Sequence, residues 1–94
     1  MILVNIKVIG KNIDLGDAFQ EFSQRRLSEI FEKYSYDVVS SQITLEKKFG
    51  SFKAKLKINL KNKIELDATG RGKEANIAFE DAIERAEKRL RRYH

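Results

Sequence analysis

The hydrophobic positions of the chain recur at every second residue in four segments. The clearest segment is 52–60, in which Phe, Ala, Leu, Ile and Leu alternate with Lys, Lys, Lys and Asn. This pattern is typical of an antiparallel strand with one buried face and one solvated face. Segments 38–46 and 63–69 alternate in the same way, whereas 2–9 carries apolar residues on both faces. The period therefore predicts four strands, the first of them well covered.

The phase of this alternation predicts which side chains face the core. In segment 38–46 the expected inward positions are Val39, Ser41, Ile43 and Leu45. Stretches rich in glycine, asparagine and lysine are expected to end the strands or form turns, because glycine and asparagine favour turn conformations. Such stretches are found at 10–12, 47–51, 61–62 and 70–72.

Two other segments, 15–34 and 73–93, show the longer period of an amphipathic helix. The apolar positions expected to form one arc of the first helix are Phe19, Phe22, Leu27, Ile30 and Tyr34. The second helix has an arc of alanines and larger residues, made of Ala75, Ala78, Phe79, Ala82, Ile83, Ala86, Leu90 and Tyr93. Asp14 or Gly16 is expected to cap the first helix.

The resulting order is β-α-β-β-β-α. A helix between the first two strands permits a parallel pair with a right-handed crossover, and the short turns that follow predict an antiparallel meander. A helix cannot cover the face that carries Lys53, Lys55 and Lys57. We therefore predict an α+β two-layer sandwich with a four-stranded sheet and both helices on one face, similar to a double-stranded-RNA-binding domain.

Composition limits the chemistry that the chain can perform. Its 94 residues suit one domain spanning 1–94, and there is no cysteine and a single histidine, His94. Disulfides and cysteine metal sites are thereby excluded, and the serines have no internal histidine to act as a base. No apolar run reaches the ~18 residues of a membrane span, and the N-terminus has no signal-peptide pattern. We expect a cytoplasmic protein that is not an enzyme and has no metal, cofactor, small-molecule substrate or membrane partner.

The net charge of +5 is unevenly distributed. Segment 46–63 holds seven lysines and one glutamate, and segment 85–94 holds five basic residues and one glutamate. The remainder of the chain is therefore negative. Segregated positive charge favours a polyanionic partner such as RNA, although clustered lysines can also serve only to solvate a surface.

Within the second helix, Arg85, Lys88 and Arg92 are spaced three and four residues apart and should form one ridge, joined by Arg89. Compensation of the helix dipole would explain one or two such cations but not four. The sheet lysines are interpreted mainly as solubilising or as protection against edge aggregation. The facing flanks of the two helices are expected to form a continuous cationic groove, with the sheet lysines on the opposite side.

Several residues permit two interpretations at this level. Arg26 falls inside the apolar arc of the first helix, either as a side chain that extends to solvent or as a cation held beside the second helix. Tyr34, Tyr36 and Phe49 could stack on bases, although Tyr34 fits the core better. The glycines at 70 and 72 precede a helix but match no phosphate-binding motif, so a strand-ending turn is the better interpretation.

The segment 10–19, GKNIDLGDAF, running on to Arg25, Arg26 and Leu27, resembles the start of bacterial ribosome hibernation-promoting factors. This family has also been called ribosome-associated inhibitors and sigma-54 modulation proteins. The resemblance covers essentially the whole chain and shares its β-α-β-β-β-α order. It implies a domain that binds small-subunit ribosomal RNA over the channel for messenger and transfer RNA and inhibits translation by idle ribosomes.

The resemblance also assigns roles to residues. Matched by position, Arg26 on the first helix and Arg85, Lys88 and Arg92 on the second are expected to contact ribosomal RNA, with Arg89 beside them. Lys11, Arg25 and Lys73 are expected as secondary contacts. The implied partner is the small ribosomal subunit, and the protein is expected to be monomeric away from it.

The chain departs from the family pattern at three places. Gly16 stands where a threonine cap is usual, and Ala75 and Asn76 stand where a Met-Tyr pair is common. The chain ends at His94, so we expect a short member or the N-terminal domain of a longer one. Two other functions stay open at this level: a general double-stranded RNA-binding module, and an interaction protein that modulates transcription.

Overall fold

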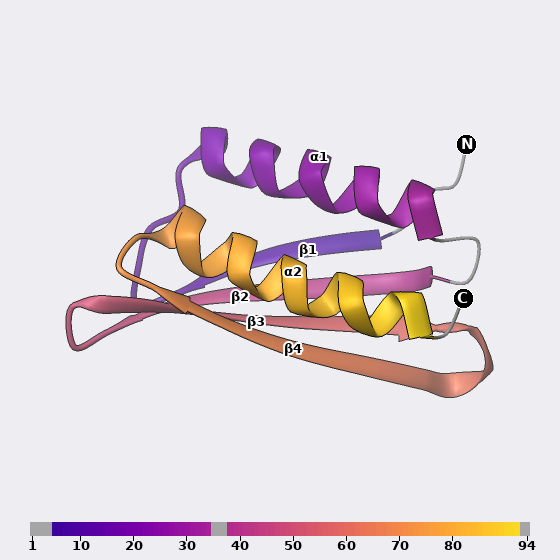
Figure 1. The fold of residues 1–94 in the computed structure, drawn as a ribbon. Helices are drawn as coiled ribbons and strands as arrows, with labels where there is room; N and C mark the ends of the chain where they lie inside the picture. The colour runs from indigo at the N-terminus through magenta and orange to yellow at the C-terminus, as the bar shows by residue number, and fades with distance from the viewer. Residues whose placement is uncertain (1–4, 35–37, 93–94) are drawn as a thin grey trace.

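The computed structural model describes residues 5–34 and 38–92 of the protein (Figure 1). The elements, in chain order, are β1 (Asn5–Lys11), α1 (Asp17–Tyr34), β2 (Val38–Lys48), β3 (Ser51–Leu60), a 3-10 turn η1 (Lys61–Lys63), β4 (Ile64–Gly72) and α2 (Ala75–Arg92). This is the predicted order, and the α+β class is confirmed.

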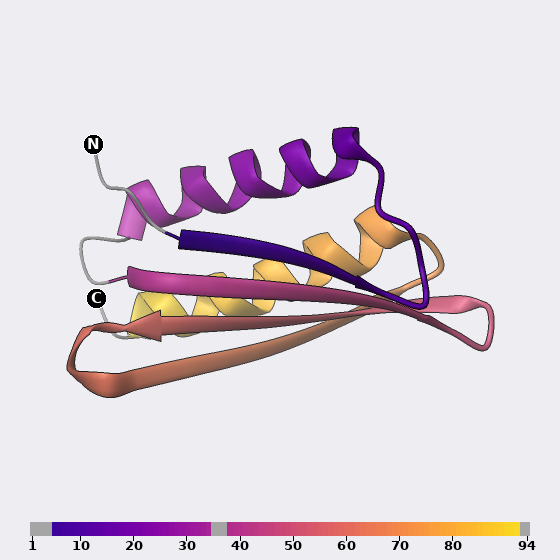
Figure 2. The same cartoon turned by 180° about the vertical axis from the view of Figure 1, so that it is seen from behind.

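The four strands form one sheet in the order β1-β2-β3-β4. The β1–β2 pair is parallel and the other two pairs are antiparallel, as the connections predict, because a parallel pair needs a crossover and α1 supplies it. Both helices lie on the same face of the sheet, and the opposite face is open (Figures 1 and 2). The predicted two-layer sandwich is therefore confirmed.

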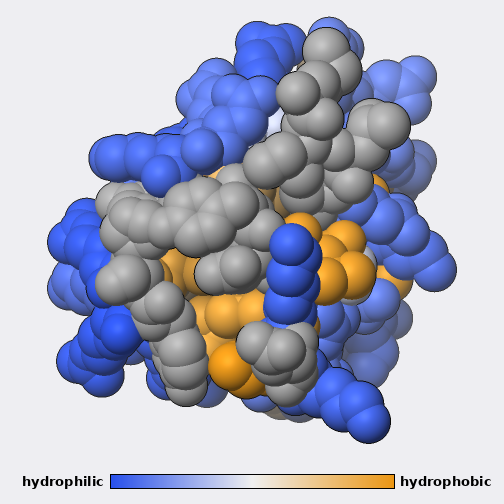
Figure 3. All heavy atoms as spheres, turned by 90° about the vertical axis from the view of Figure 1, so that its right-hand side faces the viewer, coloured by the Kyte–Doolittle hydropathy of each residue, from blue (hydrophilic) through white to orange (hydrophobic). Residues whose placement is uncertain are grey.

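The core lies between the helices and the covered face of the sheet. Alternate residues of β3 are buried as predicted, with Leu56 at 1% exposure. The small alanine side chains of α2 allow the helix to approach β4 closely. The approach leaves no room for a side chain at Gly70, where an added Cβ would overlap the backbone nitrogen of Ala82 and the carbonyl oxygen of Ala78. Seen from the end at which the helices finish, apolar residues lie in the middle and hydrophilic ones outside (Figure 3).

The register of β2 corrects one sequence prediction. The pairing with β3 shifts between Val38 and Ser40, so Val38 is buried at 6% exposure while Val39, predicted to face inward, is 53% exposed. The three inward positions that follow, Ser41, Ile43 and Leu45, are buried as predicted. An irregularity of this kind inserts one residue and reverses the facing of those on one side of it, which simple alternation cannot anticipate.

The buried arc of α1 also differs from the predicted arc. Phe31 and Ser23 are fully buried, although neither was assigned to the core, whereas Phe22 is 39% exposed. Ser23 is accommodated because its hydroxyl donates to the carbonyl of Phe19 at 2.8 Å. Phe22 stays at the margin of the core, where its ring meets that of Phe79 edge-on at 5.8 Å.

The element bounds differ from the predicted ones by a few residues. Gly10 and Lys11 continue β1, because both pair with β2, and β4 continues through Gly72. The turn expected at 47–51 is only two residues long, since β2 extends through Lys48 and β3 begins at Ser51. The helices start two residues later than predicted. Residues 2–4, Tyr36, Tyr93 and the side chain of Tyr34 lie outside the described residues.

Candidate nucleic-acid interface

One flank of α2, on the side of the edge strand β4, gathers the predicted basic ridge. The four cations line a single shallow hollow of about 720 Å³ that continues onto β4: Arg85, Lys88, Arg89 and Arg92, together with Asp67, Ala68, Thr69, Asp81 and Glu84. All four cations are exposed. The structure thus brings the four α2 residues predicted from the sequence onto one surface, which we call the α2 flank.

The α2 flank carries acids as well as cations. Four positive and three negative side chains line its hollow. Arg85 is held by Asp81, whose carboxylate accepts from Nε at 3.4 Å, whereas no described acid pairs with Lys88, Arg89 or Arg92. These three cations need not break an ion pair with a described residue before they meet a phosphate.

Asp81 connects the end of β4 to the middle of α2. Its carboxylate also accepts a hydrogen bond from the backbone N–H of Arg71 at 3.1 Å. That bond, reinforced by the nearby charges of Arg85 and Lys88, lowers the pKa of Asp81 below its ordinary value. Asp81 was not predicted as a functional position, and the one signal in the sequence is its place four residues before Arg85. It holds the helix against the strand and orients the first arginine of the ridge.

The opposite flank of α2 faces α1 and carries compensated charge. Arg26 donates from Nε and Nη2 to the two carboxylate oxygens of Glu80 at 3.3 and 3.4 Å. In the last turn of α1, Lys33 lies 3.7 Å from Glu87. The prediction of a continuous cationic groove between the helices is therefore wrong: the flank of α2 that faces α1 bears acids, and the ridge lies on the other side.

The remaining predicted contacts are dispersed. Arg26 lies between the helices with its side chain 34% exposed, away from the α2 flank. Lys11 is on the open face of the sheet, 3.7 Å from Glu46, and Arg25 pairs with Glu21 within α1 at 3.4 Å. Lys73 is exposed in the turn that precedes α2. The structure does not gather these four residues with the ridge.

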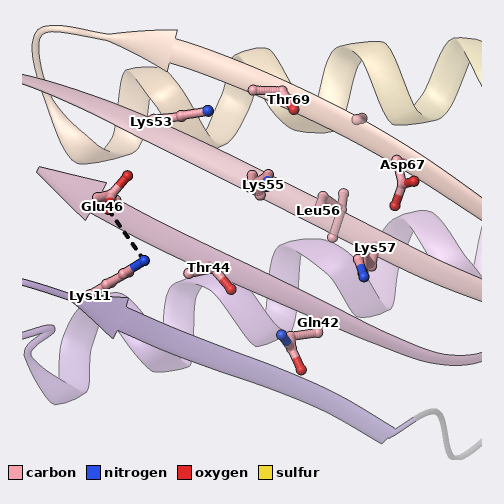
Figure 4. Close-up of a pocket in the computed structure, with 11 residues that line it drawn as sticks. Lys11, Gln42, Thr44, Glu46, Lys53, Lys55, Leu56, Lys57, Asp67 and Thr69 are labelled. Carbon is pink, nitrogen blue, oxygen red and sulfur yellow. Dashed lines mark ion pairs between the residues drawn. The ribbon is translucent and has the colours of Figure 1, made fainter. Parts of the chain in front are cut away.

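The open face of the sheet is the second basic surface. Figure 4 shows the lysines of β3 in front of the strands, with both helices behind the sheet. They line a hollow of about 420 Å³ together with polar residues of the neighbouring strands: Lys11, Gln42, Thr44, Glu46, Lys53, Lys55, Leu56, Lys57, Asp67, Ala68 and Thr69. Residues 67–69 line both this hollow and that of the α2 flank. The sheet lysines thus lie on the face opposite the helices, as predicted, although the two hollows adjoin along β4.

Within residues 5–34 and 38–92, no three acidic or histidine side chains gather in a way that could hold a metal ion. Neither helix in that part of the chain is apolar over a length that would cross a bilayer.

Comparison with known proteins relates this surface to a family. The sequence pattern of the family described as sigma 54 modulation protein / S30EA ribosomal protein matches residues 6–94. A ribosome hibernation promotion factor of Rhizobium meliloti (strain 1021) is 38% identical over 90 residues, and one of Bradyrhizobium diazoefficiens is 29% identical over 90 residues. Each alignment covers 96% of this chain but only 47% and 44% of the relatives, so the chain spans about half their length.

Two solved structures share the fold of this chain over nearly its whole length. The N-terminal domain of Thermus thermophilus Protein Y superposes with a TM-score of 0.85 at 20% identity, covering 96% of this chain and 99% of that one. A ribosomal subunit interface protein from Coxiella burnetii gives a TM-score of 0.86 at 15% identity, covering 95% and 96%. At these identities the likeness establishes the fold.

Proposed function

Since the chain belongs to the sigma 54 modulation protein / S30EA ribosomal protein family, we propose that it binds the small ribosomal subunit through ribosomal RNA. In this proposal the domain lies over the channel for messenger and transfer RNA and inhibits translation by idle ribosomes. It acts in the cytoplasm as a binding domain without catalytic chemistry. The relatives' name, ribosome hibernation promotion factor, supports the proposed action on idle ribosomes.

The α2 flank is the observation on which the proposal depends. Lys88, Arg89 and Arg92 are exposed and have no described acid partner, and they lie on one face of two consecutive helical turns. Arginine forms paired, charge-assisted hydrogen bonds with phosphate, and lysine contacts it as a point charge. Arg85, Lys88 and Arg92 follow one another at about 4.5 and 6 Å along the helix axis, a spacing that suits the successive phosphates of an RNA strand. We therefore assign the main RNA contact to the α2 flank.

Arg26 and the dispersed cations have a secondary role in this proposal. Arg26 is already paired with Glu80, so an RNA phosphate would have to share or replace that carboxylate. Lys11 and Arg25 also have acid partners, whereas Lys73 is exposed beside the start of α2. We expect each of these residues to contribute less to binding than a residue of the α2 flank.

Co-sedimentation with purified small subunits tests the proposal directly. The protein should travel with the subunit in a sucrose gradient, and its affinity should fall steeply between ~50 and 200 mM salt because phosphate contacts release counterions. It should compete with initiator transfer RNA and slow initiation in a cell-free reaction without added nucleotide. Tight binding that leaves initiation unchanged would contradict the channel assignment.

Two other classes of partner are distinguishable in the same experiment. A general duplex-binding module would bind an isolated RNA duplex as tightly as the subunit, because duplex recognition depends mainly on helix shape. A transcription-modulating protein would retain a component of RNA polymerase and leave the subunit fraction empty. Either result would replace the present proposal.

A further inference from the structure

The β2–β3 hairpin ends in a turn of unusual composition. Its two turn residues, Phe49 and Gly50, both have left-handed backbone conformations, with φ of 53° and 78°. Two-residue hairpins favour this geometry because it matches the twist of the strands, but they normally use Asn or Gly at the first position. A bulky side chain at positive φ costs roughly 1–3 kcal/mol and persists only where the surroundings or a function require it.

Packing does not explain the phenylalanine. Phe49 is 95% exposed, far more than any other large apolar side chain among the described residues. The ammonium group of Lys48 lies over the Phe49 ring, 5.8 Å from the ring centroid. The hairpin tip also projects beyond the start of α2, so neither helix covers it (Figures 1 and 2). The turn therefore presents an aromatic ring to solvent at a conformational cost.

The surroundings of the ring are cationic. Phe49 borders a hollow of about 270 Å³ whose other lining residues are Glu46, Lys48, Ser51, Phe52, Lys53 and Arg71. Lys53 and Arg71 are directly opposite each other in the β3–β4 ladder, and Glu46 is directly opposite Lys53 in the β2–β3 ladder. The single acid is already engaged, since Lys11 lies 3.7 Å from its carboxylate. The hollow thus combines one free aromatic surface with three cations.

We propose that the hairpin tip is a second RNA contact, in which the Phe49 ring stacks on an unpaired base while Lys48, Lys53 and Arg71 hold the flanking phosphates. Aromatic stacking beside cations is how proteins bind single-stranded RNA, since every base has a π-face. A paired base offers no free face, so the contact selects loops, bulges or strand ends over duplex. A hydrophobic pocket on a protein would be a poor partner, because three lysine or arginine side chains would be carried towards it.

This contact is independent of the α2 flank. The flank lies along the second half of α2, whereas the hairpin is at the end of the sheet where that helix begins (Figure 1). The proposal requires only RNA with an exposed base and would hold even if the partner were not the small subunit.

Phe49→Asn tests the proposal, because Asn-Gly is the favoured sequence for this turn. The variant should melt at a higher temperature than the wild type. Its affinity for an unstructured single-stranded RNA oligonucleotide should nevertheless fall by roughly 5- to 150-fold, the range that one lost base stack implies. Phe49→Tyr, which keeps the ring, should retain the wild-type affinity. Unchanged binding by Phe49→Asn would overturn the proposal.

A spectroscopic readout is available because the protein contains no tryptophan. In Phe49→Trp the single indole should be quenched by the single-stranded oligonucleotide and not by a duplex of equal length. No quenching by the single strand, or equal quenching by both, would contradict stacking on an unpaired base.

Small subunits serve as the third probe. Loss of subunit binding by Phe49→Asn with full retention of oligonucleotide binding would mean that the ring docks on a subunit protein, and would overturn the proposal. Quenching by the oligonucleotide in a protein that does not sediment with subunits would support the hairpin contact while rejecting the proposed ribosomal function.

Discussion

The guanidinium of Arg26 in α1 faces the carboxylate of Glu80 in α2, with Nε 3.3 Å from Oε1 and Nη2 3.4 Å from Oε2. The sequence allowed two interpretations of a cation inside the apolar arc of α1. The structure supports the second one, a cation held beside the other helix, but held by an acid that the helical arc does not identify. The pair links two helices whose direct contact is small.

We expect a modest coupling energy between Arg26 and Glu80. Both side chains are about one-third or more exposed, so a coupling of about 0.5–1 kcal/mol is expected from a double-mutant cycle of Arg26→Gln and Glu80→Gln in urea unfolding. The pair Glu21 and Arg25, which lies within one helix and is more exposed, is the matched control and should couple by no more than ~0.5 kcal/mol. Equal coupling in the two cycles would show that the contact between the helices adds nothing.

Gly70→Ala should destabilise the domain strongly. The added methyl group would overlap the backbone of Ala78 and Ala82, and backbone cannot give way as a flexible side chain does. The free energy of unfolding should fall by about 1–3 kcal/mol or more. Gly16→Ser is the control, because a Cβ added at Gly16 would meet nothing within 4 Å and serine is a good helix cap, so this change should be neutral or stabilising. Tolerance of Gly70→Ala would mean that α2 lies farther from β4.

Asp81 should make the stability depend on acidic pH. Its pKa is lowered in the folded protein, so the unfolded chain binds the proton more tightly and stability decreases as pH falls. The contribution is complete above the ordinary carboxylate pKa and is lost as pH falls through the lower, folded value. Urea unfolding of wild type and Asp81→Asn should therefore differ near neutral pH and converge at strongly acidic pH. A difference that is independent of pH would exclude this origin.

Much of the fold was predictable because the alternation in β3 and the alanine arc of α2 are regular. Leu56 and Ala82 are buried as their periods require. The predictions went wrong where one residue interrupts a period: the shift after Val38 exposes Val39. In α1 the buried face differs from the predicted one, because Phe31 lies in the core and Phe22 at its margin. Only the tertiary contacts of α1 decide which side of its broad apolar arc faces the sheet.

The candidate site was predictable in part, because part of it depends only on regular spacing within one helix. Spacing within one helix places Arg85, Lys88 and Arg92 on one ridge, since that relation needs no knowledge of neighbours. It does not show which element the ridge adjoins, and the ridge proved to lie over β4 and not opposite α1. The partner of Arg26 is 54 residues away along the chain, so it could be found only from the structure.

The last prediction compares the two basic surfaces at equal charge. Replacing Arg85, Lys88 and Arg92 together with glutamine should leave the fold intact, because all three are exposed. It should lower small-subunit affinity by several kcal/mol if each contact contributes roughly 1.5–3 kcal/mol, and should reduce the salt slope by about three. The matched control replaces Lys7, Lys55 and Lys57, exposed lysines of the strands that avoid the hairpin hollow.

The control removes the same charge, so it separates a specific contact from general attraction. If only long-range attraction matters, both triple variants should lose the same affinity and keep similar salt slopes. A larger loss in the sheet variant would move the main contact to the open face, which adjoins the α2 flank at residues 67–69. Only a selective loss in the α2 variant supports direct phosphate contacts there, because the glutamines keep most of the side-chain length and lose the charge.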